Sequence, residues 1–258
     1  MTSPFAVVTG ASTGIGLELA RQFLEHGHDV LVCADEEISS QALDGPGVQK
    51  LEVDLRARAG VQQLYQAIKD TGRGVDALAL NAGVGQGGAF VEQELEDILS
   101  IVELNVTSTV HLARLVLTDM VARNSGRVLV LSSIASLMPG SYQAVYNASK
   151  SFLQSFTQAV QAELSGSAVT LTALMPGPTE TQFFERADMA DNTRVGQSNK
   201  DDPAKVAAQG YTAMMAGKRR VVGGGSATRA QYFAGMVLPD VVKAAVHSLM
   251  AKPQRPAA

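Results

Sequence analysis

The sequence is poor in cysteine and aromatic residues, and it lacks a long apolar run. Its 258 residues include one cysteine, Cys33, and no tryptophan, and aromatic residues make up 5%. A lone cysteine excludes an internal disulfide and suits a reducing compartment, so we expect a cytoplasmic protein. No apolar run approaches the roughly 20 residues of a membrane span, and the first residues lack the pattern of a signal peptide. We therefore expect no membrane partner.

An excess of charge of one sign is also missing. Lys and Arg number 21, Asp and Glu number 25, the net charge is −4, and no basic block extends beyond residues 218–220. This balance argues against a nucleic-acid partner. The four histidines lack the spacing of a metal site, so we expect no metal. Hydrophobic residues at 46% suffice for a sizeable core, and without a visible boundary we expect one domain over residues 1–258.

A strand, a glycine-rich turn and a helix follow one another at the N-terminus. The apolar run of residues 5–9 leads into Gly10-Ala11-Ser12-Thr13-Gly14-Ile15-Gly16, after which Leu19 and Phe23 continue at helical spacing. Glycines let the backbone approach a pyrophosphate, and a helix N-terminus offers amide donors to it. The order therefore predicts a dinucleotide-binding turn, and an ordinary glycine-rich turn is the alternative.

The second apolar run, residues 29–34, ends at Asp35. A carboxylate at this place accepts hydrogen bonds from the ribose hydroxyls of an adenosine and repels a 2′-phosphate. Glu36 and Glu37 follow at once, so a solvated acidic loop is the alternative. If the turn binds a dinucleotide, Asp35 favours NAD over NADP.

Further apolar runs alternate with segments of helical period. They cover residues 48–53, 75–80, 127–131 and 168–175, and residues 92–123 indicate two helices or one long kinked helix. This alternation predicts an α/β fold, with a parallel, doubly wound sheet of Rossmann type and helices on both faces. A ligand of such a sheet lies at the carboxyl ends of the strands.

Tyr146 and Lys150 stand four positions apart and share one face of a predicted helix. An ammonium one turn away favours the phenolate of a tyrosine whose free pKa is about 10, so we expect Lys150 to lower the pKa of Tyr146. Such a pair also arises by chance. Ser133 follows a predicted strand and offers a hydroxyl for a substrate oxygen. Ser132 competes for this role, but adjacent strand residues point to opposite faces.

With these motifs in this order, the chain resembles the short-chain dehydrogenase/reductase family, in its Tyr-x-x-x-Lys branch. The resemblance covers roughly residues 4–215 and includes Asn81-Ala82-Gly83, where Leu80 replaces the asparagine that usually comes first. It implies a seven-stranded sheet and selects Ser133 by its spacing from Tyr146. Thr13 stands where NADP-dependent relatives often carry a basic residue, which also favours NAD.

The resemblance also implies the site residues. The expected catalytic residues are Asn105, which would hold a water of a proton relay, Ser133, Tyr146 and Lys150. The expected cofactor-binding residues are Gly10, Ser12, Thr13, Gly14, Ile15, Gly16, Asp35, Asp54, Leu55, Asn81, Ala82, Gly83, Tyr146, Lys150, Pro176, Gly177, Thr179 and Thr181. Asp54 and Leu55 would border the adenine, and Thr179 or Thr181, with Thr181 favoured, would hold the nicotinamide carboxamide.

The implied activity is reversible hydride transfer between a nicotinamide cofactor and a carbonyl or secondary alcohol. Two alternatives stay open: an epimerase or dehydratase with tightly bound NAD, and a non-catalytic sensor of the NAD redox state. Sensors of this fold often lose the tyrosine, which is present here. We expect a homodimer or homotetramer. The unusual segment 218–225, in place of the family's common final strand, puts a full tetramer in doubt.

Three more expectations concern the second half of the chain. In a helix over residues 144–165, we expect Phe152, Phe156 and Val160 to form a buried stripe. We expect a substrate lid within residues 181–215, whose Phe183, Phe184 and Met189 indicate a partly hydrophobic substrate, or else fill core beneath a loop. A helix is expected over about 238–250, and a disordered tail over about 252–258.

Overall fold

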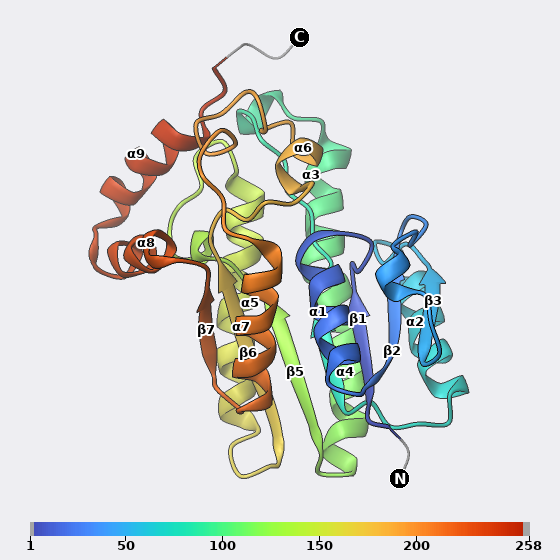
Figure 1. Ribbon diagram of the computed structural model, residues 1–258. Helices are drawn as coiled ribbons and strands as arrows, with labels where there is room; N and C mark the ends of the chain where they lie inside the picture. The colour runs from blue at the N-terminus through green and yellow to red at the C-terminus, as the bar shows by residue number, and fades with distance from the viewer. Residues whose placement is uncertain (1–2, 255–258) are drawn as a thin grey trace.

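The structure, a computed structural model, describes residues 3–254, and a parallel sheet forms its centre (Figure 1). Within that range the sheet has seven strands in the order β3-β2-β1-β4-β5-β6-β7, and all neighbours pair in parallel. The strands are β1 (Phe5–Thr9), β2 (Asp29–Ala34), β3 (Val48–Glu52), β4 (Ala77–Leu80), β5 (Gly126–Leu131), β6 (Val169–Pro176) and β7 (Arg220–Gly223). The expected fold class is confirmed.

Each face of the sheet has its own core. Along β1, Phe5 and Val7 enter one core, whereas Ala6 and Val8 enter the other. The first core is covered by α2 (Arg58–Asp70), α4 (Ser108–Ala122) and α5 (Ala144–Glu163), and the second by α1 (Gly14–Glu25) and α7 (Pro203–Met215). Strands covered on both faces are apolar at every position, which explains why the sequence shows continuous apolar runs.

The strand order reverses direction at the centre of the sheet. β1 pairs with β2 on one side and with β4 on the other. At such a switch point the loops after neighbouring strands diverge and leave a crevice at the carboxyl ends. Gly10 follows β1, Asn81 follows β4 and Ser133 follows β5, so the fold brings these residues to one edge.

The long helical region before β5 is interrupted at Asn105. α3 (Leu95–Val102) runs into a π-helical turn, Glu103–Thr107, and α4 begins at once after it. A π-turn widens the helix locally and occurs frequently at functional sites. The expected kinked helix is confirmed, and its irregular turn contains a predicted site residue.

The expected buried stripe on α5 is wrong at Phe152, whereas Phe156 and Val160 pack partly buried against the first core. Phe152 is 44% exposed and stacks on Phe156, which is only partly buried. The buried positions of α5 are instead Asn147, Ser149, Lys150, Leu153, Gln154 and Thr157. The helix is rotated so that the face with Lys150 turns inward, and the sequence pattern does not reveal this because that face carries several polar residues.

The second half of the expected lid is a helix of the protein body. Asp202 caps α7 through a 2.9 Å hydrogen bond from the Ala204 amide, and Pro203 stands in the first turn, where its missing N–H costs nothing. Val206 and Tyr211 of α7 share a core with α1 and the sheet. A lid that extends to residue 215 is therefore wrong.

The C-terminal part adds helices at the edge of the sheet near β7 (Figure 1). α9 (Asp240–Ala251) confirms the expected last helix, whereas α8 (Ser226–Val237) was not expected. The remaining helical segments are α6 (Phe183–Arg186) and 3₁₀ turns at Gln41–Leu43, Phe90–Glu92 and Ile134–Leu137. Of the tail expected to be disordered, residues 255–258 lie outside the described residues. Within residues 3–254, no helix combines the length and apolar character needed to cross a membrane.

We predict that Gly210→Val lowers the free energy of unfolding by about 1–3 kcal/mol, because added volume in a packed core forces neighbours apart. A Cβ at Gly210 would lie 2.7 Å from Leu174 Cδ2, where α7 contacts the sheet. Urea denaturation measures the change. Ala204→Val, at an exposed position of α7, is the control and should stay within about 0.5 kcal/mol. Equal free energies of unfolding for the two variants would indicate that α7 is not packed on the sheet, as expected of a lid.

Candidate active site

A cleft of about 1070 Å³ opens at the carboxyl edge of the sheet. Its volume suits a ligand as large as a dinucleotide together with a small molecule. Most of the predicted site residues line it: Gly10, Ser12, Thr13, Gly14, Ile15, Gly16, Asp35, Leu55, Asn81, Ala82, Gly83, Ser133, Tyr146, Lys150, Pro176, Gly177, Thr179 and Thr181. Asp54 and Asn105 do not line the cleft. Asp54 instead contacts Arg56, and Asn105 contacts Val84, and both of these partners line it.

The glycine turn forms one wall of the cleft and requires its glycines. Gly14 has a φ of +59°, which side chains disfavour. A Cβ at Gly16 would lie 2.0 Å from the Gly10 carbonyl oxygen, so α1 starts as close to the turn as backbone atoms permit. The amides of the first turn of α1 are therefore presented at the cleft, which fits a pyrophosphate.

Asn81 ties the end of β4 to this turn. Its Nδ2 donates to the carbonyl oxygens of Thr9 and Gly10, each at 2.9 Å. The Thr9 hydroxyl oxygen accepts from the Asn81 and Ala82 amides, each at 3.0 Å. The buried Asn81 Oδ1 has no hydrogen-bond partner among residues 3–254. Asn81 thus supports the backbone at the switch point and keeps an acceptor free beside the cleft.

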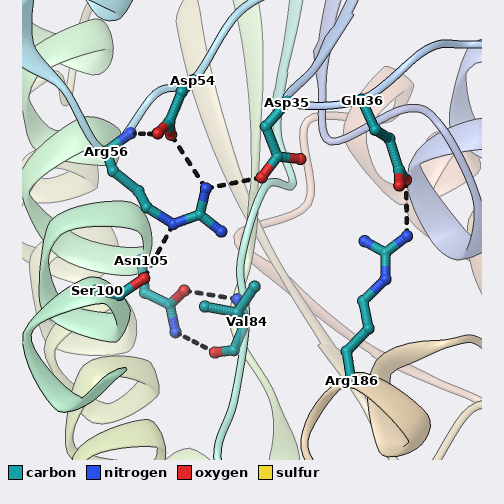
Figure 2. Close-up of polar contacts among 8 residues, drawn as sticks. All are labelled: Asp35, Glu36, Asp54, Arg56, Val84, Ser100, Asn105 and Arg186. Atoms are coloured by element: carbon teal, nitrogen blue, oxygen red, sulfur yellow. Dashed lines mark hydrogen bonds and ion pairs between the residues drawn. The ribbon is translucent and has the colours of Figure 1, made fainter. Parts of the chain in front are cut away.

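Asn105 fixes the loop after Gly83. Its Oδ1 accepts from the Val84 amide and its Nδ2 donates to the Val84 carbonyl, both at 2.9 Å (Figure 2). Nδ2 also donates to Ser149 Oγ on α5 at 2.9 Å. A Cβ at Gly83 would lie 3.1 Å from Asn105 Oδ1 and 3.3 Å from Lys150 Nζ. Gly83 therefore lets the amide and the ammonium approach each other.

The two serines after β5 point in different directions. Ser132 is buried, and its hydroxyl donates to the Lys150 carbonyl at 3.3 Å. Ser133 Oγ accepts from the Ala135 amide at 3.0 Å and hydrogen-bonds the Tyr146 side chain. Ser133 is therefore the serine that faces the tyrosine, in agreement with the choice that the family resemblance implies from its spacing to Tyr146.

Burial controls the charges of Tyr146 and Lys150. Burial raises the pKa of Tyr146 to about 12, although its hydrogen bond with Ser133 acts in the opposite direction. Burial lowers the pKa of Lys150 to about 8. Lys150 Nζ donates to the Leu131 carbonyl at 2.9 Å and lies 5.8 Å from the centroid of the Tyr146 ring. The expectation that Lys150 lowers the pKa of Tyr146 is wrong here, because burial raises that pKa and the Lys150 ammonium is directed at the Leu131 carbonyl.

An ion-pair cluster that the sequence did not reveal surrounds Asp35. Arg56 Nη1 lies 2.7 Å from Asp35 Oδ2 and 3.1 Å from Asp54 Oδ1, and Arg56 Nε donates to Ser100 Oγ at 2.9 Å (Figure 2). Partial burial raises the pKa of Asp35, but the hydrogen bond and charge of Arg56 outweigh it and the net pKa is lowered. Asp54 thus faces Arg56. The one indication of Arg56 in the sequence is its position directly after Asp54-Leu55, which are predicted cofactor-binding residues.

A second pair joins Glu36 to Arg186 of α6 at 2.6 Å (Figure 2). Glu36 also hydrogen-bonds Ser12 of the glycine turn, and this bond, followed by Arg186, lowers the pKa of Glu36. One carboxylate therefore connects α6, the end of β2 and the turn. The partners are 150 positions apart in the sequence, so no local pattern indicates their contact.

The segment after β6 covers the cleft from the other side. Thr179 is buried and donates to the Gly177 carbonyl at 2.9 Å, whereas Thr181 faces Gly14, where an added Cβ would lie 2.8 Å from Thr181 Cγ2. Phe183 contacts Tyr146, with ring centroids 5.0 Å apart. Phe184 and Met189 are buried in a small core with Ala187 and Ala251, so these two fill core beneath the loop.

α8 and α9 line the end of the cleft beyond Tyr146. Their lining residues include Gln231, Val246, His247 and Met250, and Leu238 between the two helices also lines the cleft. His247 Nδ1 lies 2.9 Å from the Ser141 carbonyl oxygen and must donate to it, and burial lowers the pKa of His247. Neutral His247 therefore keeps Nε2 as an acceptor. Across residues 3–254, no group of three or more His, Cys, Asp or Glu side chains is arranged to hold a metal.

Comparison with known proteins agrees with this geometry. The sequence pattern of the family described as short chain dehydrogenase matches residues 4–192. NADP-dependent 3-hydroxy acid dehydrogenase YdfG of Salmonella typhi is 30% identical over 203 residues, 77% of this chain and 82% of its own. Oxidoreductase UcpA of Salmonella typhimurium is 32% identical over 214 residues, 80% of this chain and 78% of its own. A short-chain dehydrogenase from Sphingobium yanoikuyae, solved in complex with NADPH, has a TM-score of 0.78 at 26% identity and covers 99% of this chain and 98% of its own.

The family match extends over more than half of the chain, and these relatives are named as dehydrogenases or an oxidoreductase. The epimerase and sensor alternatives are not favoured. With the strand order, the glycine turn and the facing serine and tyrosine in place, the resemblance found in the sequence is confirmed. The chain belongs to the short-chain dehydrogenase family and is a nicotinamide-dependent oxidoreductase.

Proposed function

We propose that this oxidoreductase interconverts a carbonyl compound and a secondary alcohol, with Tyr146 as the acid or base. The observation that carries the proposal is the convergence of Ser133, Tyr146 and Lys150 on one cleft with the glycine turn. Each has a chemically competent group, and Ser133 and Tyr146 hydrogen-bond each other. A substrate oxygen placed between these two hydroxyls would contact both.

The residues of the cleft fit a nicotinamide dinucleotide. The glycine turn and the start of α1 would hold its pyrophosphate, Asp35 the adenosine ribose and Lys150 the nicotinamide ribose, while Thr179 or Thr181 would hold the carboxamide. When bound, the cofactor supplies or accepts the hydride and, when oxidised, brings a positive charge. The unpartnered Asn81 Oδ1 beside the turn supports a polar ligand at this place.

Ser133 and Tyr146 act on the substrate oxygen. In reduction, Ser133 donates a hydrogen bond to the carbonyl oxygen, and Tyr146 gives up its proton as the alcohol forms. With a pKa of about 12, Tyr146 is protonated and ready at neutral pH. In oxidation, Tyr146 takes the alcohol proton, which requires its pKa to fall. Lys150, whose pKa of about 8 leaves it mostly charged at pH 7, promotes this fall once its charge faces the phenolate.

Asn105 and the π-turn support the proton route. The turn departs from regular helical hydrogen bonding, and Asn105 holds the Val84 backbone beside Lys150. A water held by the backbone of the π-turn would pass the proton from Lys150 to solvent. The amide of Asn105 is already engaged with Val84 and Ser149, so its role is to position the relay.

We propose NAD as the preferred cofactor, because the Asp35 carboxylate accepts ribose hydroxyls and repels a 2′-phosphate, and Thr13 adds no positive charge. The named cofactors of two relatives, NADP for YdfG and NADPH for the Sphingobium enzyme, point the other way. The balance of charge around Asp35 therefore decides the preference.

The substrate is proposed to carry a hydrophobic portion, since Phe183, Leu238, Val246 and Met250 line the cleft near or beyond Tyr146. We propose that a lid corresponds to residues 181–202, with α6 held by the Glu36–Arg186 pair. Assembly as a homodimer or homotetramer and a cytoplasmic location stay predictions. The exposed apolar side chains Phe152, Phe233, Val237 and Val241 support an oligomer.

Tyr146→Phe is expected to lower turnover by a factor of about 10²–10⁴, the usual contribution of a general acid, and to leave NADH binding almost unchanged. Turnover is measured with a panel of ketones and secondary alcohols with both NADH and NADPH, and binding by fluorescence titration. Phe152→Tyr, on the exposed side of the same helix, is the control. Unchanged turnover of Tyr146→Phe would refute the assignment.

Lys150→Met is expected to stabilise the cofactor-free protein at pH 7 by up to about 3 kcal/mol while abolishing turnover. The lysine has a folded-state pKa of about 8 against 10.5 for a free lysine, so the folded state disfavours its charge. This penalty is complete below pH 8 and disappears as the pH rises toward 10.5. Urea denaturation at pH 7 and pH 10 should therefore show a gain that shrinks with pH. Lys205→Met, at an exposed position, should show neither change, and a loss of stability in Lys150→Met at pH 7 would contradict the cause given for the lowered pKa.

Arg186→Gln and Glu36→Gln are each expected to increase the dissociation rate of NADH about two- to fivefold, because an exposed ion pair contributes about 0.2–1 kcal/mol. Stopped-flow displacement measures this rate, and the effect should fade at high salt. Arg194→Gln, exposed in the same loop, is the control. Equal rates in all variants would argue against a lid held by this pair.

A further inference from the structure

The adenosine end of the cleft contains a cation among acids. Arg56 lies between Asp35, directly after β2, and Asp54, shortly after β3. Its Nη1 serves both carboxylates and its Nε is fixed by Ser100, whereas Nη2 has no hydrogen bond among the described residues. The side chain is 31% exposed, and the residue lines the cleft. The guanidinium of Arg56 is thus held through Nε and Nη1, while the N–H donors of Nη2 stay free to bind a ligand.

We propose that Arg56 determines cofactor selectivity, by weakening the repulsion between Asp35 and a 2′-phosphate so that the cleft accepts NADP as well as NAD. With a 2′-hydroxyl, Asp35 keeps its pair with Arg56 and accepts from the ribose. With a 2′-phosphate, the guanidinium turns from Asp35 to the phosphate. The inference rests on the proposed binding of a nicotinamide dinucleotide in this cleft, and it does not depend on the catalytic residues.

The chemistry of the two side chains supports both states. A carboxylate has about four lone-pair sites, and the pair with Arg56 leaves the others of Asp35 for ribose hydroxyls. A guanidinium is planar and binds phosphate through two parallel N–H bonds, which Nη1 and Nη2 can supply while Nε stays on Ser100. Moving the bond from a carboxylate to a more highly charged phosphate keeps the arginine paired. The exposed position makes such an exchange easy.

Arg186 is the other arginine to consider, and the structure places it differently. It is paired with Glu36 and also donates to Gln182 on its own segment at 2.7 Å. Figure 2 shows Arg56 and Arg186 on opposite sides of the Asp35-Glu36 segment, with Asp35 directed at Arg56. Asp35 is the residue proposed to hold the ribose, so the arginine in contact with it is the one that meets a substituent on the ribose.

A pair of ligands that differ by one phosphate tests the proposal without turnover. Adenosine 5′-monophosphate and adenosine 2′,5′-bisphosphate are titrated by calorimetry into the protein, Arg56→Gln, Asp35→Asn and the double variant. Arg56→Gln should weaken the bisphosphate about tenfold or more and the monophosphate less than threefold, since one unit charge near a dianion is removed. Asp35→Asn should strengthen the bisphosphate about tenfold, and the double variant should lose that gain. The gain should also decrease with salt.

Arg73→Gln is the matched control, because Arg73 pairs with Asp29 at the same 2.7 Å and the same 31% exposure but at the start of β2. It should leave both affinities unchanged. Equal weakening of both ligands by Arg56→Gln, or a double variant that keeps the gain of Asp35→Asn, would overturn the proposal. Failure of both ligands to bind any variant would overturn it too, together with the cofactor assignment. If the two affinities change as expected but the unmodified protein shows no turnover, the result would count against the proposed catalysis and not against the role of Arg56.

Discussion

The burial of Lys150 is the constraint on which the rest of the site depends. An ammonium removed from water needs an acceptor, and it finds the carbonyl of Leu131 at the end of β5 at 2.9 Å. This contact sets the rotation of α5 and thereby the position of Tyr146 one turn away. Gly83 has no side chain to separate Lys150 from Asn105, and the π-turn directs Asn105 to the same place. The end of β5, the helix α5 and the loop after β4 thus all contact the buried ammonium of Lys150.

The two ends of the cleft use charge in opposite ways. At the chemical end, Tyr146 and Lys150 are buried, and desolvation moves their pKa values to about 12 and about 8, toward the neutral forms. At the end around Asp35, the side chains of Asp35, Arg56, Glu36 and Arg186 are partly exposed and form pairs that solvent weakens. The buried groups are held in one position with shifted pKa values, whereas the exposed ion pairs can exchange partners when a ligand binds.

The lining of the cleft also divides along the chain. Elements up to β6 form the part that fits a dinucleotide, whereas α6, α8 and α9 close over the region beyond Tyr146. The family match ends at residue 192, so the segments that line the region beyond Tyr146 lie mostly past it.

The sequence by itself determined what depends on neighbours along the chain. Alternating apolar runs give the sheet, the glycine spacing gives the turn before α1, and four-residue spacing places Tyr146 and Lys150 on one helix face. The tertiary structure decided what depends on distant contacts and on exclusion of water. Arg56 reaches Asp35 from the loop after β3, Arg186 reaches Glu36 across 150 positions, and α5 buries a polar face in place of the stripe with Phe152. The directions of the pKa shifts of Tyr146 and Lys150 belong to the same group, because desolvation arises when the packed chain removes water from a side chain.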